Sequence, residues 1–444
     1  MPPHLKTVNE HAAGIDVGSR QHSVAVPVGS CAPGDEVLFF DTFTPDLNAL
    51  ADWLERCSVD TVAMESTGVY WIPLYELLVE RGFEVLLVDT SQIKYAPGRK
   101  TDYLDCQWIQ KLHTFGLLTG AFHPDNEIRQ LRGYVRQRSM LVVEGSKPVQ
   151  HIQKALEQMN VKLTSVLRDV MGKTGLSIIE AILDGQRTPE ELAQFRHANC
   201  KEDASTFVKA LQGNWREEHL FSLRQSLDLW LYYKTKIKEC DAEIEKLLGD
   251  QFDLSGGKEL APRKTKRPNR RNELSFDGRT LLYQMIGVDL TAAEGIEEST
   301  ALTIISEIGT DMSAWGNAKR FASWLKLCPG NNKTGGYNKS GRNRKSANRA
   351  AQALRLAAQT VARSKTSLGA FYRRKAATRG SSIAIKATAH KLAVIVYSML
   401  KYGTEYVTRS QEQYEQQYRN RQLRNLKRQA KRLGYQVLEL PKTA

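Results

Sequence analysis

The order of strand and helix patterns in residues 1–90 restricts the fold more than any other feature of the chain. Three strand-like runs come first, and helical and strand-like segments then alternate. In order, they are strands at 12–17, 21–27 and 36–42, a helix at 45–57, a strand at 61–64, a helix at 70–81 and a strand at 83–89. The first two strands are close enough for a hairpin, and the alternation that follows is typical of a mixed α/β sheet.

Four acidic residues fall at the ends of these segments. Asp16 lies near the end of the first strand, and Glu65 follows the fourth. Asp102 and Asp105 begin a helical pattern that runs to about residue 115. Residues three apart share a helix face, and neighbouring carboxylates repel one another unless a cation lies between them. Because hard divalent cations such as Mg²⁺ prefer oxygen ligands, we predict that the four acids form one metal site for phosphodiester chemistry. The alternative for the helical pair is a capping or helix-dipole role.

This order of segments is the order of the ribonuclease-H-like fold. In that fold, carboxylates from the first strand, the fourth strand and a later helix converge on bound metals. We therefore expect a ribonuclease-H-like domain at the start of the chain.

The middle of the chain has long helical patterns and no strand patterns. Residues 127–160 and 203–248 carry apolar residues at helical spacing, with breaks near Gly145 and Gly213. Their apolar stripes are narrow, which favours a helical hairpin or a coiled coil that mediates oligomerisation. A helical domain that packs only on itself is the alternative.

The net charge of +14 favours a polyanionic partner, and nucleic acid is the obvious candidate. Residues 255–272 are basic and interrupted by Pro and Gly, as in a linker or a nucleic-acid-contacting arm. A Gly-rich stretch from 333 to 349 contains six basic residues and no acid, which suits contact with a phosphate backbone. The six are Lys333, Lys339, Arg342, Arg344, Lys345 and Arg349. The helical tail at about 409–433 is also basic, and either extends this surface or stays solvated.

The cysteines and the apolar runs bear on location. The six cysteines are far apart and none forms a C-x-x-C, so a zinc site is not expected. Scattered cysteines fit a reducing compartment. Residues 1–10 have no apolar signal core, and we expect no run near the ~20 apolar residues that span a bilayer. The sequence predicts a cytoplasmic protein without a membrane partner.

We expect five segments. They are an α/β catalytic domain at 1–125, a helical, coiled-coil-like domain at 126–254, a basic linker at 255–281, a mainly α-helical C-terminal domain at 282–408 and a basic helical tail at 409–444.

Taken together, these motifs resemble the DEDD transposases of insertion sequences, which are described as bridge-RNA-guided recombinases. The stretches Gly14-Ile-Asp16-Val-Gly18, Met64-Glu65-Ser-Thr-Gly68 and Lys100-Thr-Asp102-Tyr-Leu-Asp105 are similar to the motifs of the family's RuvC-like domain. The stretch Leu327-Cys-Pro-Gly-Asn-Asn and the later Ala-Leu-Arg355-Leu-Ala-Ala are similar to its C-terminal transposase domain.

The resemblance implies a mechanism and partners. The four acids would bind two divalent ions, here taken as Mg²⁺, and a serine of the C-terminal domain would attack DNA to form a phosphoserine intermediate. In this chain the matching step is Thr334-Gly335-Gly336, so the hydroxyl belongs to a threonine, which is a more hindered nucleophile. Ser340, also followed by Gly, is the other candidate. The implied partners are donor and target DNA and a structured non-coding RNA, and we expect a homodimer or homotetramer.

Two other functions remain open from the residues. A ribonuclease-H-like nuclease or junction resolvase would use a metal-bound water in place of the protein hydroxyl. A basic nucleic-acid-binding protein would carry out no cleavage at all.

Overall fold

The computed structural model describes residues 6–66, 68–93, 101–251, 253–262, 272–328, 332–334, 337–339, 348–403 and 411–438. The chain divides into two compact units, an N-terminal unit of residues 1–123 and a C-terminal unit of residues 124–444. Each unit has its own core, and each is described separately below.

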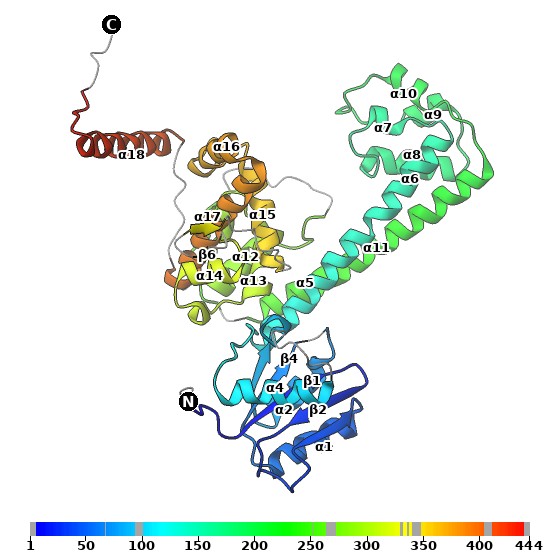
Figure 1. Cartoon of the computed structure of the whole chain (residues 1–444). Coiled ribbons are helices and arrows are strands. Elements are labelled where there is room, and N and C mark those ends of the chain that lie inside the picture. Colours follow the sequence, from blue (N-terminus) through cyan, green and yellow to red (C-terminus); the bar gives the residue numbers. More distant parts are fainter. Residues whose placement is uncertain are drawn as a thin grey trace. The chain divides into compact units, whose positions relative to one another are not determined.

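The N-terminal unit is built on a five-stranded mixed sheet in the order β3-β2-β1-β4-β5 (Figure 1). β1 pairs antiparallel with β2, and β2 with β3, whereas β1–β4 and β4–β5 are parallel. The strands are β1 (Ala12–Val17), β2 (Gln21–Ala25), β3 (Val37–Asp41), β4 (Thr61–Glu65) and β5 (Glu84–Val88). This topology confirms the prediction of a ribonuclease-H-like N-terminal domain.

Side-chain alternation along the strands assigns the two faces of the sheet. One face carries Ile15 of β1 and Met64 of β4, and it packs against apolar residues of α1 (Thr44–Arg56) and α2 (Trp71–Glu80). The opposite face carries Ala63 and Ala25, and it packs against Ile109 and Cys106 of α4 (Asp102–Thr114). A short helix α3 (Thr90–Ile93) follows β5. Every even-numbered residue of β1 therefore belongs to the α4 face.

A long helical stem opens the C-terminal unit. α5 (Asn126–Glu144) and α6 (Ser146–Gln158) are joined at Gly145, and both pack along the 33-residue helix α11 (Glu217–Gly249) (Figure 1). Between them the chain forms a small helical subdomain at one end of the stem, with α7 (Leu163–Val166), α8 (Lys173–Leu183), α9 (Pro189–Ala193) and α10 (Ala204–Ala210). The long helical patterns were thus predicted, together with α10, which precedes the expected break near Gly213, whereas α7, α8 and α9 were not predicted.

The rest of the described C-terminal unit is a bundle of helices with one short hairpin. Its elements are α12 (Gly278–Ile286), η1 (Leu290–Ala292), α13 (Glu298–Ile308), η2 (Ser313–Trp315), α14 (Ala318–Trp324), β6 (Asn332–Thr334), β7 (Tyr337–Lys339), α15 (Arg349–Val361), α16 (Ser367–Arg379), α17 (Ser381–Tyr402) and α18 (Gln411–Arg432). Only the backbone of β6 and β7 is described.

Helix α17 corrects one expectation. By length and composition it is apolar enough to cross a membrane, contrary to the prediction that no run approaches that length. Leu392, Val396 and Tyr397 of α17 are nevertheless buried, and the helix packs against α14, α15 and α16. The central helix of a helical bundle meets the same criteria, so the finding is weak evidence for a membrane span.

Arginines of α5 fasten the stem to the bundle. The Arg136 guanidinium donates two hydrogen bonds of 2.8 Å to the Glu307 carboxylate on α13, and Arg132 donates to the Ser306 and Glu307 carbonyl oxygens. Paired, planar hydrogen bonds of this kind fix orientation as well as distance. The stem and α13 are therefore held in a defined geometry.

Candidate active site

The strand register places Asp16 beside Glu65. Ile15 of β1 is paired with Met64 of β4, and the two acids are the next residues along these parallel strands. Both belong to the face that α4 covers, because Ile15 and Met64 point to the other face. Both side chains are partly exposed. Two carboxylates from distant parts of the sequence thus meet at one edge of the sheet.

Gly14 allows α4 to lie directly on β1. A Cβ atom at Gly14 would lie 2.2 Å from the Gln110 amide nitrogen and 2.5 Å from the Cys106 carbonyl oxygen, both on the α4 backbone. Only glycine permits such a close approach between two backbones. The first glycine of the Gly14-Ile-Asp16-Val-Gly18 motif therefore sets the distance between β1 and α4.

Asp102 and Asp105 belong to the first turn of α4, at the end where the helix dipole favours negative charge. The N-cap of this helix is Thr101, so neither aspartate is the capping residue. Asp102 is exposed and Asp105 is half-buried. Because α4 is fixed against β1, both carboxylates act electrostatically on Asp16.

The three neighbouring acids strongly perturb Asp16. Burial, the charge of Glu65 and then the charges of Asp102 and Asp105 raise the pKa of Asp16 to about 7. A hydrogen bond from the side chain of Glu65 acts in the same direction. Asp16 therefore lies in a much more negative environment than an ordinary surface carboxylate does.

Cys106 lies beside this group and does not take part in it as a thiolate. Burial raises the pKa of its thiol to about 12, with the charges of Asp16 and Asp105 acting in the same direction. Its Sγ donates a hydrogen bond to the Tyr103 carbonyl oxygen at 3.2 Å. The donors available to a cation at this site are therefore carboxylate oxygens.

The chemistry of these donors fits a hard divalent cation, which takes carboxylate oxygens and would neutralise their repulsion. Among the residues that the structure describes, no three His, Cys, Asp or Glu side chains are arranged closely enough to hold one ion together. The other three acids thus act electrostatically on Asp16, but the described side chains do not form a closed ligand shell.

The candidate residues of the C-terminal unit are only partly described. Thr334 ends β6, where its backbone pairs with Tyr337 of β7; Lys333 pairs with Asn338 and Lys339 with Asn332. Arg349 begins α15 with an exposed side chain. Ser340, Arg342, Arg344 and Lys345 lie outside the described residues.

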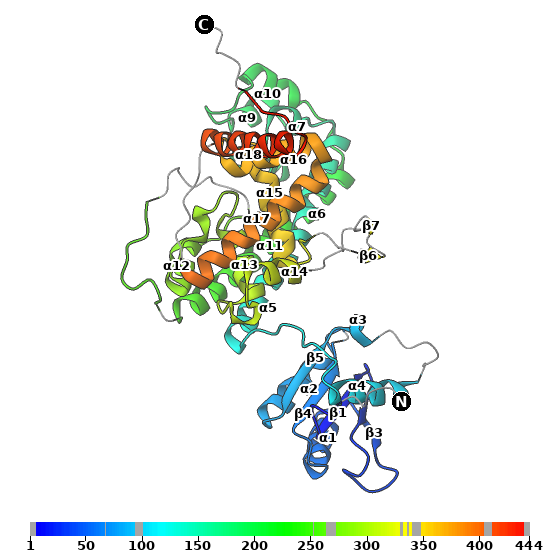
Figure 2. The same ribbon diagram turned by 60° about the vertical axis from the view of Figure 1, so that its left-hand side comes forward.

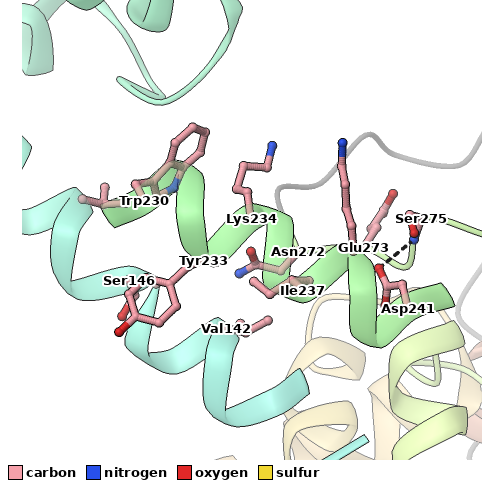
Figure 3. A pocket seen from close by; sticks show the side chains of 13 residues that line it. Val142, Ser146, Trp230, Tyr233, Lys234, Ile237, Asp241, Asn272, Glu273 and Ser275 are labelled. Carbon is pink, nitrogen blue, oxygen red and sulfur yellow. Dashed lines mark hydrogen bonds between the residues drawn. The ribbon is translucent and has the colours of Figure 1, made fainter. Parts of the chain in front are cut away.

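A pocket of about 180 Å³ lies on the stem, between the bend at Gly145 and α11 (Figure 3). Trp230, Tyr233 and Lys234 line it from α11, and residues 272–275 border it. Of its two acids, Glu273 also has a partner, and Asp241 is bound by the Arg138 guanidinium and accepts a hydrogen bond from the Ser275 amide. Because that carboxylate is already neutralised, we assign the pocket no part in the chemistry.

The order and directions of the strands in the mixed sheet place the N-terminal unit in the ribonuclease-H-like class. A family model of IS110-type DEDD transposases, described as Transposase, matches residues 13–161. A second model, described as Transposase IS116/IS110/IS902 family, matches residues 289–373. The chain belongs to the IS110 family of DEDD transposases, enzymes that cut and rejoin DNA and depend on divalent metal ions. A search of curated proteins found no match.

The first match covers all four predicted acids and the whole of α4, and the second covers β6, β7 and α15. Sequence reasoning had singled out the acids from their positions at strand and helix ends. It did not identify Gly14 as the residue that brings α4 to β1. The signal for that role was present only as a small residue two positions before an acid.

Proposed function

We propose that this transposase cuts DNA by attack of a protein hydroxyl on a phosphodiester, at a metal site formed by Asp16, Glu65 and the Asp102–Asp105 pair. The observation that carries the proposal is the position of Asp16 beside Glu65 on adjacent parallel strands, where burial and the charges of Glu65, Asp102 and Asp105 raise the pKa of Asp16. A site that concentrates negative charge in this way is suited to holding cations against a phosphate.

Each acid has a distinct part. Asp16 and Glu65, on adjacent strands of the sheet, give the site a rigid base. Asp102 and Asp105 close it from α4, whose N-terminal turn tolerates their charge. Two Mg²⁺ ions bound here would neutralise the phosphate and stabilise the departing oxygen. The protein's contribution is positioning and charge, which supply most of the rate in phosphoryl transfer.

The nucleophile is the hydroxyl of Thr334, with Ser340 as the alternative. Its oxygen forms a bond to phosphorus, the bond from phosphorus to one deoxyribose oxygen breaks, and the departing oxygen takes up a proton. Because one phosphoester bond forms to the threonine as one to deoxyribose breaks, the number of phosphoester bonds is unchanged. A second DNA hydroxyl can therefore reverse the step and reseal the strand without ATP.

Basic residues would hold the DNA near this hydroxyl. Lys333, Lys339, Arg349 and the three basic residues between 342 and 345 supply charge without a competing acid in the stretch. We further propose that a structured RNA pairs with donor and target DNA, so that base pairing reads the sequence while the protein reads duplex shape. A homodimer or homotetramer and a cytoplasmic location remain part of the proposal.

The test is a denaturing gel of end-labelled substrate DNA incubated with Mg²⁺, the RNA encoded beside the gene and the full chain. We expect DNA shifted by one protein mass, lost in Thr334→Ala and kept in Thr334→Ser. Cleavage that leaves only free ends, and survives both Thr334→Ala and Ser340→Ala, would indicate attack by water and overturn the hydroxyl mechanism. DNA binding that is unaffected by Asp102→Asn, with no cleavage at any divalent-ion concentration, would indicate a non-catalytic protein.

A further inference from the structure

The basic helix α18 lies against α16 (Figure 2). The Arg374 guanidinium carbon is 3.4 Å from the centre of the Tyr418 ring, a stacked cation–π contact. Tyr418 and Leu423 are half-buried, while most of the described side chains of α18 are exposed. Because one side of α18 is held by α16, the opposite side consistently faces solvent.

The exposed side of α18 is strongly positive. Residues 416–436 contain seven basic residues and no acid. All seven are exposed, namely Arg419, Arg421, Arg424, Lys427, Arg428, Lys431 and Arg432. Among the described residues, none of the seven forms an ion pair with a carboxylate, so their charge is available to a partner.

Helix α16 adds to this charge. It contains no acidic residue, and Lys375 and Arg379 are exposed. Arg373 is used within the protein, because it donates to the carbonyl oxygens of Ala362 and Ser364 and so fixes α16 to the end of α15. The two helices therefore present one basic surface on a well-packed support.

The spacing of the charges favours the backbone of a duplex. Arg421, Arg424, Arg428 and Lys431 follow one another at three or four residues and so share one face of the helix. A 22-residue helix is about 33 Å long, close to one turn of duplex DNA. Single-strand binders present aromatic rings on which bases stack, whereas Tyr418 is occupied by Arg374.

We propose that α16 and α18 form a surface that binds the sugar-phosphate backbone of duplex nucleic acid, without reading its sequence. The binding needs no divalent ion and does not depend on the chemistry at Asp16. The surface would hold a duplex by charge alone, so its contribution should weaken steeply with salt. The apolar residues Leu426 and Leu433 make a lipid surface the competing occupant.

The test measures binding of the full chain to a 20-base-pair duplex in EDTA across a range of salt concentrations. The variant Arg424→Gln/Arg428→Gln/Lys431→Gln removes three charges from one face of α18. We expect the slope of log affinity against log salt to become shallower by up to about 2.7, at roughly 0.9 for each phosphate that the variant no longer neutralises. DNA and RNA duplexes of the same sequence are measured separately. The duplex whose salt slope changes more in the α18 variant is identified as the natural partner.

Two controls make the result specific. Arg424→Lys/Arg428→Lys/Lys431→Arg keeps every charge at the same positions and should bind like the unmodified chain. Lys154→Gln/Lys209→Gln/Lys246→Gln removes three charges from other helices and should leave the slope unchanged.

The proposal is overturned if the α18 variant keeps the full slope, or if the second control lowers it equally. It is also overturned if the single strand depends on α18 as much as the duplex does, or if anionic vesicles bind through α18 while duplexes do not. None of these outcomes depends on DNA cleavage, so the transposase mechanism could fail while this surface is retained.

Discussion

The side chains of Asp16 and Glu65 share a hydrogen bond at adjacent positions on two parallel strands. A bond between two carboxyl groups requires a proton between them, in agreement with the pKa of about 7 for Asp16. A divalent cation would take the place of that proton. Without a cation, the carboxylates around Asp16 repel one another.

Replacing Asp16 by Asn should stabilise the N-terminal unit when divalent ions are absent. The folded-state pKa of Asp16 lies above its ordinary value of 3.8, so the folded state loses stability as pH rises from about 4 through 7. The gain in Asp16→Asn should be small at pH 5 and reach at least about 1 kcal/mol at pH 8, after allowing for solvent screening. Thermal unfolding in EDTA measures it. Glu80→Gln, an exposed acid at the end of α2, is the control and should show no such dependence.

Replacing Gly14 by Ala should abolish DNA cleavage without altering any acid. The added Cβ would overlap the α4 backbone at Gln110 and Cys106, so α4 must move away and take Asp102 and Asp105 with it. Steady-state cleavage and thermal unfolding together measure the effect. The matched control is Gly133→Ala, where a Cβ meets nothing within 4 Å, and where the substitution should add about 0.5–1 kcal/mol to stability. Full cleavage by the Gly14 variant would show that the close approach of α4 is not required.

Breaking the buried ion pair of the stem should destabilise the protein far more than breaking an exposed pair on the same helix. Arg138 donates from Nε to Asp241 at 2.5 Å and also bonds the Asn272 and Glu273 carbonyl oxygens. Asp241→Ala leaves that guanidinium buried without its counter-charge, which should cost about 3–5 kcal/mol. Glu239→Ala, two residues earlier, breaks only the exposed pair with Lys236 and should cost less than about 1 kcal/mol. Denaturant unfolding of the two variants compares them directly, and equal losses would contradict the assignment.

His113 should make the N-terminal unit less stable in mild acid. The Thr61 hydroxyl donates to the Glu84 carbonyl oxygen and lies 2.9 Å from His113 Nε2, so it accepts a hydrogen bond from the Nε2–H of the imidazole. Burial lowers the pKa of His113, against the opposing charges of Glu84 and Asp60. Below about pH 6.5 the unfolded chain takes up a proton that the folded chain refuses, and stability falls.

The measurement is the free energy of unfolding of His113→Gln and of the unmodified chain between pH 5 and pH 8. The unmodified chain should be the more stable at pH 8, and its advantage should shrink toward pH 5. A constant difference would mean that His113 has the same pKa in the folded and the unfolded chain.

The sequence was sufficient for the sheet because its strands show local patterns, and the choice of the acids, which rests on the same patterns, stays a prediction. Alternation of apolar residues located β1 and β4, and Asp16 and Glu65 stand out as acids at their ends. The closeness of α4 could not be predicted, since it depends on the absence of a side chain at Gly14 and on packing between distant segments. The helices α7, α8 and α9 were missed because elements of 4 to 11 residues show too few periodic positions. A run of membrane-spanning length was not expected at α17 because its Lys, His, Ser and Thr residues interrupt the apolar residues.

The most direct measurement is a crystal structure of the full chain soaked in Mn²⁺, with anomalous scattering used to locate the ions. We predict strong anomalous density between Asp16 and Glu65, within coordination distance of both and bordered by Asp102 or Asp105, and absent in Asp16→Asn. Anomalous density found only elsewhere in the molecule, with the four carboxylates left apart, would contradict a shared metal site and the chemistry proposed for it.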